Sequence, residues 1–115
     1  MRRGDIYLVD LEPARGNEAN KRRPVVIVSN DGANQMAEVI GRGVITVVPV
    51  TSTIDRIYEF QVLLSALETG LSNDSKAQAE QVRSVSIDRL GPVVGKVRGA
   101  SLQRLDDALR LHLGL

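Results

Sequence analysis

Two short stretches of the sequence combine side chains that can act on a phosphate group. In the first, GNEANKRRPVVIVS (16–29), three consecutive cations run directly into a proline and an apolar segment. In the second, VPVTS (48–52), two hydroxyl residues end another apolar segment. A guanidinium can donate two parallel hydrogen bonds to phosphoryl oxygens, and a hydroxyl can donate a further one. Both stretches therefore bring phosphate-binding groups to the end of an apolar segment.

The remaining inventory of reactive side chains is small. The chain has no Cys and a single histidine, His112, which we expect in a helix core or at a helix end. It contains no HExxH motif, P-loop, GxGxxG loop or GxSxG elbow, so the ordinary metal and nucleotide machineries are absent. The groups left are those of Arg, Glu, Thr, Ser and Gln. They suit metal-free RNA cleavage, in which the 2′-OH attacks the adjacent phosphorus and the protein stabilises the accumulating charge.

Arg23 is the cation whose position the sequence fixes most closely. Because it precedes Pro24, its backbone is restricted to extended geometry, and its side chain is mounted beside a rigid apolar strand. Thr51 and Ser52 follow a second such strand. Hydroxyl residues at strand ends also commonly form turns. This pattern alone leaves a structural role open for both stretches.

Length and composition predict one soluble domain, 1–115. The chain has 115 residues, 43% hydrophobic and 25% charged, with a net charge of +1. Arg accounts for 12 of the 15 basic residues. This excess favours phosphate binding, although a GC-rich genome produces the same bias. Without Cys, a signal-peptide core or a long apolar run, we expect a cytoplasmic protein with no membrane segment.

Hydrophobic patterning predicts strands first and a helix last. Ser101 is the expected N-cap of the C-terminal helix, and Gly114 its stop signal. Leu102, Leu105, Ala108, Leu109 and His112 fall on one face of it. We expect strands at 5–11, 24–29, 43–50, 58–64, 77–86 and 93–97. We also expect a polar loop at 12–23, a short helix after 30–35 and a turn at 68–75. The prediction is a mainly β fold, a small curved antiparallel sheet or partly open barrel with a C-terminal α-helix covering it.

Four blocks of the sequence together resemble a known family. RRGDIYLVDLEPARGNE (2–18), RPVVIVSND (23–31), VPVTS (48–52) and EQVRSVSIDRL (80–90) follow one another in the order and spacing of the MazF/PemK toxin endoribonucleases. The chain is especially similar to mycobacterial members. The resemblance implies an SH3-like, CcdB/MazF-type antiparallel barrel with a C-terminal helix, and a homodimer. It also implies metal-independent, cofactor-free cleavage of single-stranded RNA at short motifs, which leaves a cyclic phosphate and a 5′-OH. A cognate MazE-like antitoxin with a flexible acidic tail would cover the RNA groove.

Carried over by position, the resemblance implies three catalytic residues: Arg23, Thr51 and Glu18. Because Arg stays protonated, we expect Arg23 to neutralise the pentavalent phosphorus and guide the leaving oxygen, while Thr51 donates a hydrogen bond. Glu18 would take the 2′-OH proton or orient Arg23. A salt bridge within its loop is an equally good explanation of Glu18.

Six further residues are candidates for binding RNA. We expect Lys21 and Arg22 to position phosphates, although a solvated charge run also explains them. Asn17 stands where many relatives have Ser, so the role of that hydroxyl does not carry over. Ser52, Gln81 and Arg83 would shape or line the groove. With aromatics at only 3%, loop hydrogen bonds and Arg stacking must recognise more of the RNA than aromatic stacking does.

Two other functions fit the same fold. A CcdB-like poison binds DNA gyrase through C-terminal residues and cleaves nothing, so it has no need of Arg23 and Thr51. An SH3-like module that has lost catalysis would bind RNA with a steep salt dependence and leave it intact.

Overall fold

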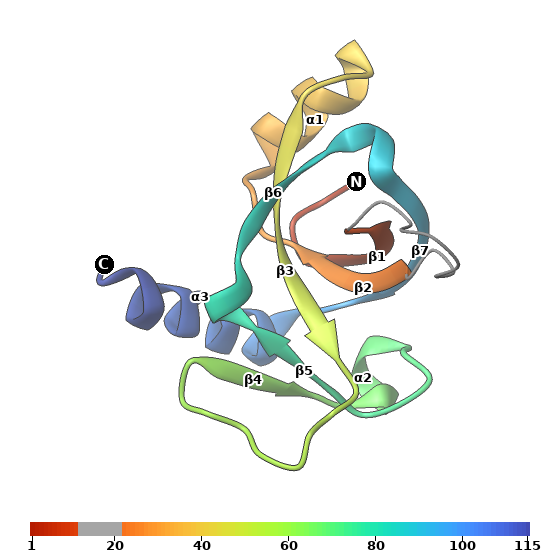
Figure 1. Cartoon of the computed structure of the whole chain (residues 1–115). Helices are drawn as coiled ribbons and strands as arrows, with labels where there is room; N and C mark the ends of the chain where they lie inside the picture. The colour runs from red at the N-terminus through yellow and green to blue at the C-terminus, as the bar shows by residue number, and fades with distance from the viewer. Residues whose placement is uncertain (12–21) are drawn as a thin grey trace, which may run out of the picture.

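A curved antiparallel sheet forms most of the computed structural model, which describes residues 1–11 and 22–115 (Figure 1). Within these residues the strand order is β4-β5-β3-β2-β1-β7, and β6 also pairs with β3. No pairing joins β4 to β7 in the described part of the chain, so the barrel is open. The strands are β1 (Asp5–Asp10), β2 (Arg22–Ile27), β3 (Val44–Thr51), β4 (Gln61–Leu64), β5 (Ser75–Gln78), β6 (Arg83–Ser86) and β7 (Leu90–Lys96). The expected mainly β fold with a C-terminal helix is confirmed.

The helices lie around this sheet. They are α1 (Asp31–Ile40), α2 (Ala66–Thr69) and α3 (Gly99–Leu113), with 3-10 turns η1 (Ala79–Gln81) and η2 (Ile87–Arg89). The side chain of Asn30 caps α1 by accepting a hydrogen bond from the Ala33 backbone N–H at 2.8 Å. A helix is therefore present, but it begins at Asp31, inside the stretch 30–35 that was expected to precede it. The turn expected at 68–75 instead includes the end of α2.

The expected strand at 77–86 is wrong, because it is two strands separated by η1. Both strands pair with β3, through Val50↔Ala77 and Val47↔Arg83. The two paired positions are three residues apart in β3 but six residues apart in the segment 77–83. The surplus residues fold into the 3-10 turn, whose Ala79 is fully buried in the core.

Strand β2 begins earlier than expected, at Arg22. Pro24 holds the preceding residue extended, so the strand continues backwards through Arg23 and pairs with β1. Val25, Val26 and Ile27 are all fully buried. This confirms the prediction that the apolar run is buried on both faces, and it gives Arg23 a rigid base.

The start of the C-terminal helix also differs from the expectation. Arg98, not Ser101, occupies the N-cap position of α3. Ser101 lies inside the helix and is buried, and its hydroxyl donates to Glu68 Oε2 at 3.2 Å, which ties α3 to α2. Gly114 ends the helix in the left-handed conformation, as expected. His112 is exposed in the last turn, so it is a helix-end histidine.

The core has two parts on the two sides of the sheet. One contains Ile6, Val26 and Val48 and is covered by Leu105 and Ala108 of α3. The other contains Val9, Val25 and Ile27 and is covered by Ala37 of α1. Strands β1, β2 and β3 contribute to both parts, so the edge where β2 begins and β3 ends is firmly held.

Candidate active site

Arg23 and Thr51 line one cavity of about 420 Å³. It lies where β2 begins and β3 ends, because the antiparallel register places Val25 opposite Pro49. Figure 1 shows the end of β3 beside α2, and the connection after α2 supplies the facing wall. Two larger hollows, of about 710 and 470 Å³, lie against α3 and contain neither residue.

Arg23 is the one charged residue among the described residues of this lining. Its side chain is exposed, and none of the ion pairs between described residues involves it. The other lining residues are apolar or neutral, and they include Leu8, Pro24, Val50, Leu71 and Val94. The polar lining residues, which include Thr51, Ser52 and Asn73, are uncharged, so no other described side chain of the lining competes with Arg23 for an anion or repels one. The described walls are therefore suited to a phosphate.

The hydroxyl of Thr51 is oriented by its own loop. Thr51 Oγ1 accepts a hydrogen bond from the Thr53 backbone N–H at 3.2 Å. This bond uses a lone pair and leaves the hydroxyl proton to be donated. Across the sheet, the buried Lys76 pairs with Thr51 and donates from Nζ to the Arg56 carbonyl at 2.6 Å. The segment after β3, which begins with the cavity residue Ser52, is thereby fastened to β5.

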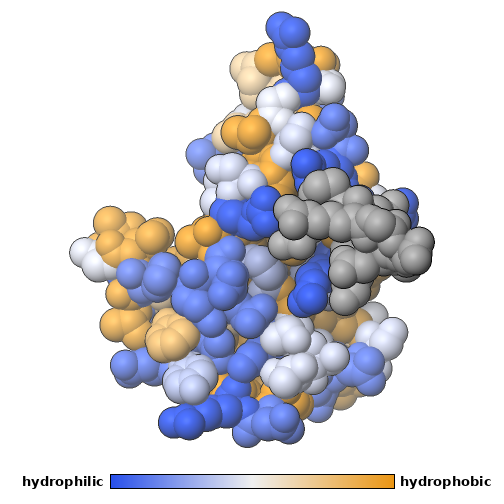
Figure 2. Space-filling view, in the orientation of Figure 1, coloured by the Kyte–Doolittle hydropathy of each residue, from blue (hydrophilic) through white to orange (hydrophobic). Residues whose placement is uncertain are grey.

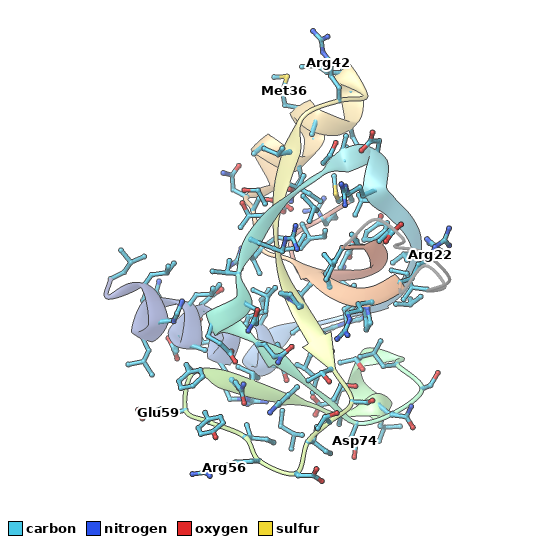
Figure 3. All side chains as sticks on the ribbon, in the orientation of Figure 1. Arg22, Met36, Arg42, Arg56, Glu59 and Asp74 are labelled. Carbon is cyan, nitrogen blue, oxygen red and sulfur yellow. The ribbon has the colours of Figure 1, made fainter. Side chains whose placement is uncertain are left out.

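The other predicted site residues are placed apart from this cavity. Figure 3 shows Arg22 beside β7, and its Nη1 lies 3.5 Å from the point where a Cβ on Gly91 would stand. Gln81 and Arg83 are exposed on η1 and β6 and do not line the cavity. The predictions for Glu18, Asn17 and Lys21 lie outside the described residues. The structure thus brings together Arg23, Thr51 and Ser52.

Comparison with known proteins identifies the family of this chain. A family model described as PemK-like, MazF-like toxin of type II toxin-antitoxin system matches residues 2–113. The chain belongs to this family.

Individual relatives match along the whole length. Endoribonuclease MazF9 of Mycobacterium tuberculosis is 63% identical over 115 residues, which are all of this chain and 98% of that protein. A mycobacterial endoribonuclease solved in complex with its cognate antitoxin superposes with a TM-score of 0.76 at 26% identity, covering 100% of this chain and 96% of that one. A MazE–MazF crystal structure from Deinococcus radiodurans gives a TM-score of 0.79 at 25% identity, with coverage of 100% and 96%.

Sequence reasoning missed one wall of the cavity in this MazF-family toxin. Residues 70–73, with Ser75 and Val94, face Arg23 and Thr51. The composition GLSNDS indicates only a turn. Nothing local in the sequence relates it to a strand almost fifty residues earlier, so only the fold reveals this contribution.

Two of the aromatic residues of this toxin, Tyr58 and Phe60, lie in the segment between β3 and β4. Tyr58 and Phe60 stack at 5.3 Å between ring centroids, and the Arg56 guanidinium lies 4.8 Å from the Tyr58 ring centre. Gln61 fixes this stack by accepting from the Tyr58 backbone N–H and donating to Glu80 Oε2 at 2.7 Å. Arg stacking is thus present in the structure, on a tyrosine of the same chain.

The two described residues with shifted pKa values, Tyr7 and Asp31, do not line the cavity. The backbone N–H of Arg3 donates to Asp31 at 2.6 Å, and this bond is the main cause that lowers the pKa of Asp31. Burial, followed by the charges of Asp5 and Glu38, raises the pKa of Tyr7. Neither residue lines the cavity, so these shifts concern stability more than chemistry.

No group of three or more His, Asp or Glu side chains in the described part of the chain is placed to hold a metal ion. No helix there is long and apolar enough to cross a membrane.

Proposed function

We propose that Arg23 and Thr51 form the catalytic pair with which this MazF-family toxin endoribonuclease cleaves single-stranded RNA. The observation that supports the pair is the shared cavity, in which Arg23 is the one charged side chain of the described lining. An RNA phosphate in this cavity would meet both the guanidinium of Arg23 and the hydroxyl of Thr51, which the register of β2 and β3 brings to the same edge. A dianionic transition state gains more from both groups than the singly charged phosphate of the substrate does.

The reaction proceeds by attack of the 2′-OH on the neighbouring phosphorus. A bond forms between the 2′-oxygen and phosphorus, and the bond from phosphorus to the 5′-oxygen breaks. Arg23 donates two parallel hydrogen bonds to the phosphoryl oxygens, and Thr51 donates another. The attacking hydroxyl loses its proton to a base, for which Glu18 is our candidate, and the leaving 5′-oxygen takes up a proton from water. The products are a 2′,3′-cyclic phosphate and a 5′-OH, and no metal ion takes part.

The remaining predicted residues bind the RNA on either side of the cut. Arg22 and Arg83 are exposed cations on β2 and β6, and they suit phosphates outside the cavity. Ser52 lines the cavity itself, and Gln81 is exposed near β6. Lys21 and Asn17 complete the proposed RNA-binding set.

The proposed partners are a MazE-like antitoxin and a second copy of this chain. One solved relative is in complex with its cognate antitoxin, and another was solved as MazE–MazF. Figure 2 shows apolar surface at the end of α3, where Leu111, Leu113 and Leu115 are 53%, 52% and 85% exposed. Exposed apolar surface of this kind favours a homodimer interface. We also propose that the toxin acts in the cytoplasm.

The test compares two adjacent arginines. Purified protein is incubated with single-stranded RNA in excess EDTA, and the product ends are identified. We expect Arg23→Ala to lower the single-turnover rate by roughly 10²- to 10⁴-fold, the effect of removing one transition-state donor or more. Arg22→Ala is the matched control, because it removes the same charge one residue outside the cavity. It should weaken binding and its salt dependence while the cleavage rate at saturation stays within a few-fold.

If Arg23→Ala and Arg22→Ala lowered the cleavage rate equally, Arg23 would have no special role in the chemistry. A requirement for magnesium would contradict the metal-free mechanism. Intact RNA together with tight binding to gyrase would favour the CcdB-like alternative, whereas intact bound RNA alone would indicate a binding module.

A further inference from the structure

The cavity wall opposite Arg23 is the turn 70–74, which is held by a specific set of polar side chains. Asp74 Oδ1 accepts from the Ala66 backbone N–H at 2.8 Å, and this fastens the turn to α2. The Ser75 hydroxyl donates to the Asn73 carbonyl at 3.0 Å. Thr69 Oγ1 accepts from the Leu71 backbone N–H at 3.2 Å. These three side chains fix the shape of the turn.

The turn is also pressed against the barrel. A Cβ atom on Gly95 of β7 would stand only 2.5 Å from the Thr69 carbonyl oxygen, so the two backbones are in close contact there. Thr69 is buried and directly precedes the turn. The wall is therefore seated on β7 and not free to drift relative to Arg23 and Thr51.

The side chains of Ser72 and Asn73 form no hydrogen bond with other described residues, although the Asn73 backbone carbonyl accepts one from Ser75. Both side chains are exposed and line the cavity. The side-chain hydrogen bonds that fix the turn, among the described residues, come from Thr69, Asp74 and Ser75. A preorganised turn thus presents one hydroxyl and one carboxamide towards the space beside Arg23.

A carboxamide offers a donor and an acceptor together, which matches the paired groups on the edge of a nucleobase. Single-stranded RNA exposes these edges, and proteins read them by hydrogen bonding. A cavity of about 420 Å³ has room for a nucleotide next to the phosphate held by Arg23. The hydroxyl of Ser72 suits a ribose or phosphate oxygen of the same nucleotide.

We propose that Asn73 is a specificity-determining residue that reads the base next to the cleaved phosphate, and that Ser72 binds the same nucleotide. This inference rests on the proposed function, because it uses the phosphate position defined by Arg23 and Thr51. It assigns to residues 72 and 73 the choice of cut site, and to residues 23 and 51 the chemistry.

The test maps cut sites on a random-sequence RNA by sequencing the new ends. Asn73→Ala should lower the preference at one position beside the cut by about tenfold, as expected for losing a paired hydrogen bond to a base edge. Asn73→Asp keeps an acceptor and loses the donor, so it should shift that preference towards a base that offers a donor. Ser72→Ala should raise KM several-fold and leave the site preference unchanged. Gln103→Ala, an exposed amide on α3 outside the cavity, is the control and should cut like the unmodified toxin.

An unchanged cut-site pattern in both Asn73 variants would overturn the proposal. A uniform rate loss at every site, with the preference intact, would also overturn it, because it indicates a structural role. If Asn73→Ala fails to fold in a thermal melt, the more conservative Asn73→Asp decides. If the unmodified toxin cuts no RNA, or if Arg23→Ala cuts as fast as the unmodified toxin, the proposed function fails first, and the two failures are thereby distinguished.

Discussion

Adding one methyl group at Gly95 should displace the cavity wall without touching any residue of the cavity. The Cβ of an alanine there would stand 2.5 Å from the Thr69 carbonyl oxygen, whereas ordinary contact begins at 3.4 Å. Since backbone lies on both sides, α2 or β7 must move by about 0.9 Å, the difference between these distances. Gly95 is not in the positive-φ region, so the effect comes from this contact and not from backbone strain.

The effect of this displacement can be measured on stability and on the cleavage rate. Overpacking of this kind costs about 1–3 kcal/mol of unfolding free energy, measurable by urea denaturation. A misplacement near 1 Å at a reacting centre costs up to roughly 10²-fold in rate, so the single-turnover cleavage rate should fall about 10- to 100-fold. The rate is measured at a temperature where both proteins are fully folded.

Gly32→Ala is the matched control. It adds the same methyl group on α1, 3.3 Å from the Asn30 side chain, and should leave the cleavage rate unchanged. If Gly95→Ala lost stability yet cleaved RNA at the unmodified rate, the wall would have no role in the chemistry, and the reasoning that joins the turn 70–74 to Arg23 would be refuted.

Two further predictions concern stability. Leu105 is fully buried between α3 and the sheet, so Leu105→Ala should lower the unfolding free energy by about 2–5 kcal/mol in urea denaturation. Leu67→Ala, at a position 96% exposed, should cost far less, and equal losses would contradict the assignment of the core. The pKa of Asp31 is lower in the folded protein than its usual value of 3.8. The Asp31 carboxylate therefore stabilises the fold at pH values above 3.8, and this contribution is lost as the pH falls through the folded-state pKa. Asp31→Ala should therefore lower the melting temperature at pH 7, and the difference should shrink below pH 4; a difference independent of pH would contradict the assigned cause.

Local chemistry made part of the site predictable. The restriction that Pro24 places on Arg23 depends on adjacent residues, and the structure shows Arg23 extended at the start of β2. Gly114 likewise ends α3 by a local conformational rule. Arg23 and Thr51 line one cavity, and the catalytic roles that the family resemblance implies for them stay a prediction.

Features that depend on distant contacts were not predictable. Serine is a residue type that often caps helices, but Ser101 lies inside α3, where its hydroxyl contacts Glu68 of α2. The break at η1 arises from the register of two strands against β3, which no single segment encodes. The wall at 70–73 depends on the close approach of Gly95 to Thr69, which are 26 positions apart.

A double-mutant cycle of the single-turnover cleavage rate shows whether Arg23 and Thr51 act on one phosphate. Arg23→Ala, Thr51→Val and the double variant are compared with the unmodified toxin on one RNA at saturation. Groups that stabilise the same transition state are strongly non-additive, so the double variant should lose much less than the product of the two single losses. Losses that multiply independently, or a Thr51→Val variant as fast as the unmodified toxin, would contradict the account.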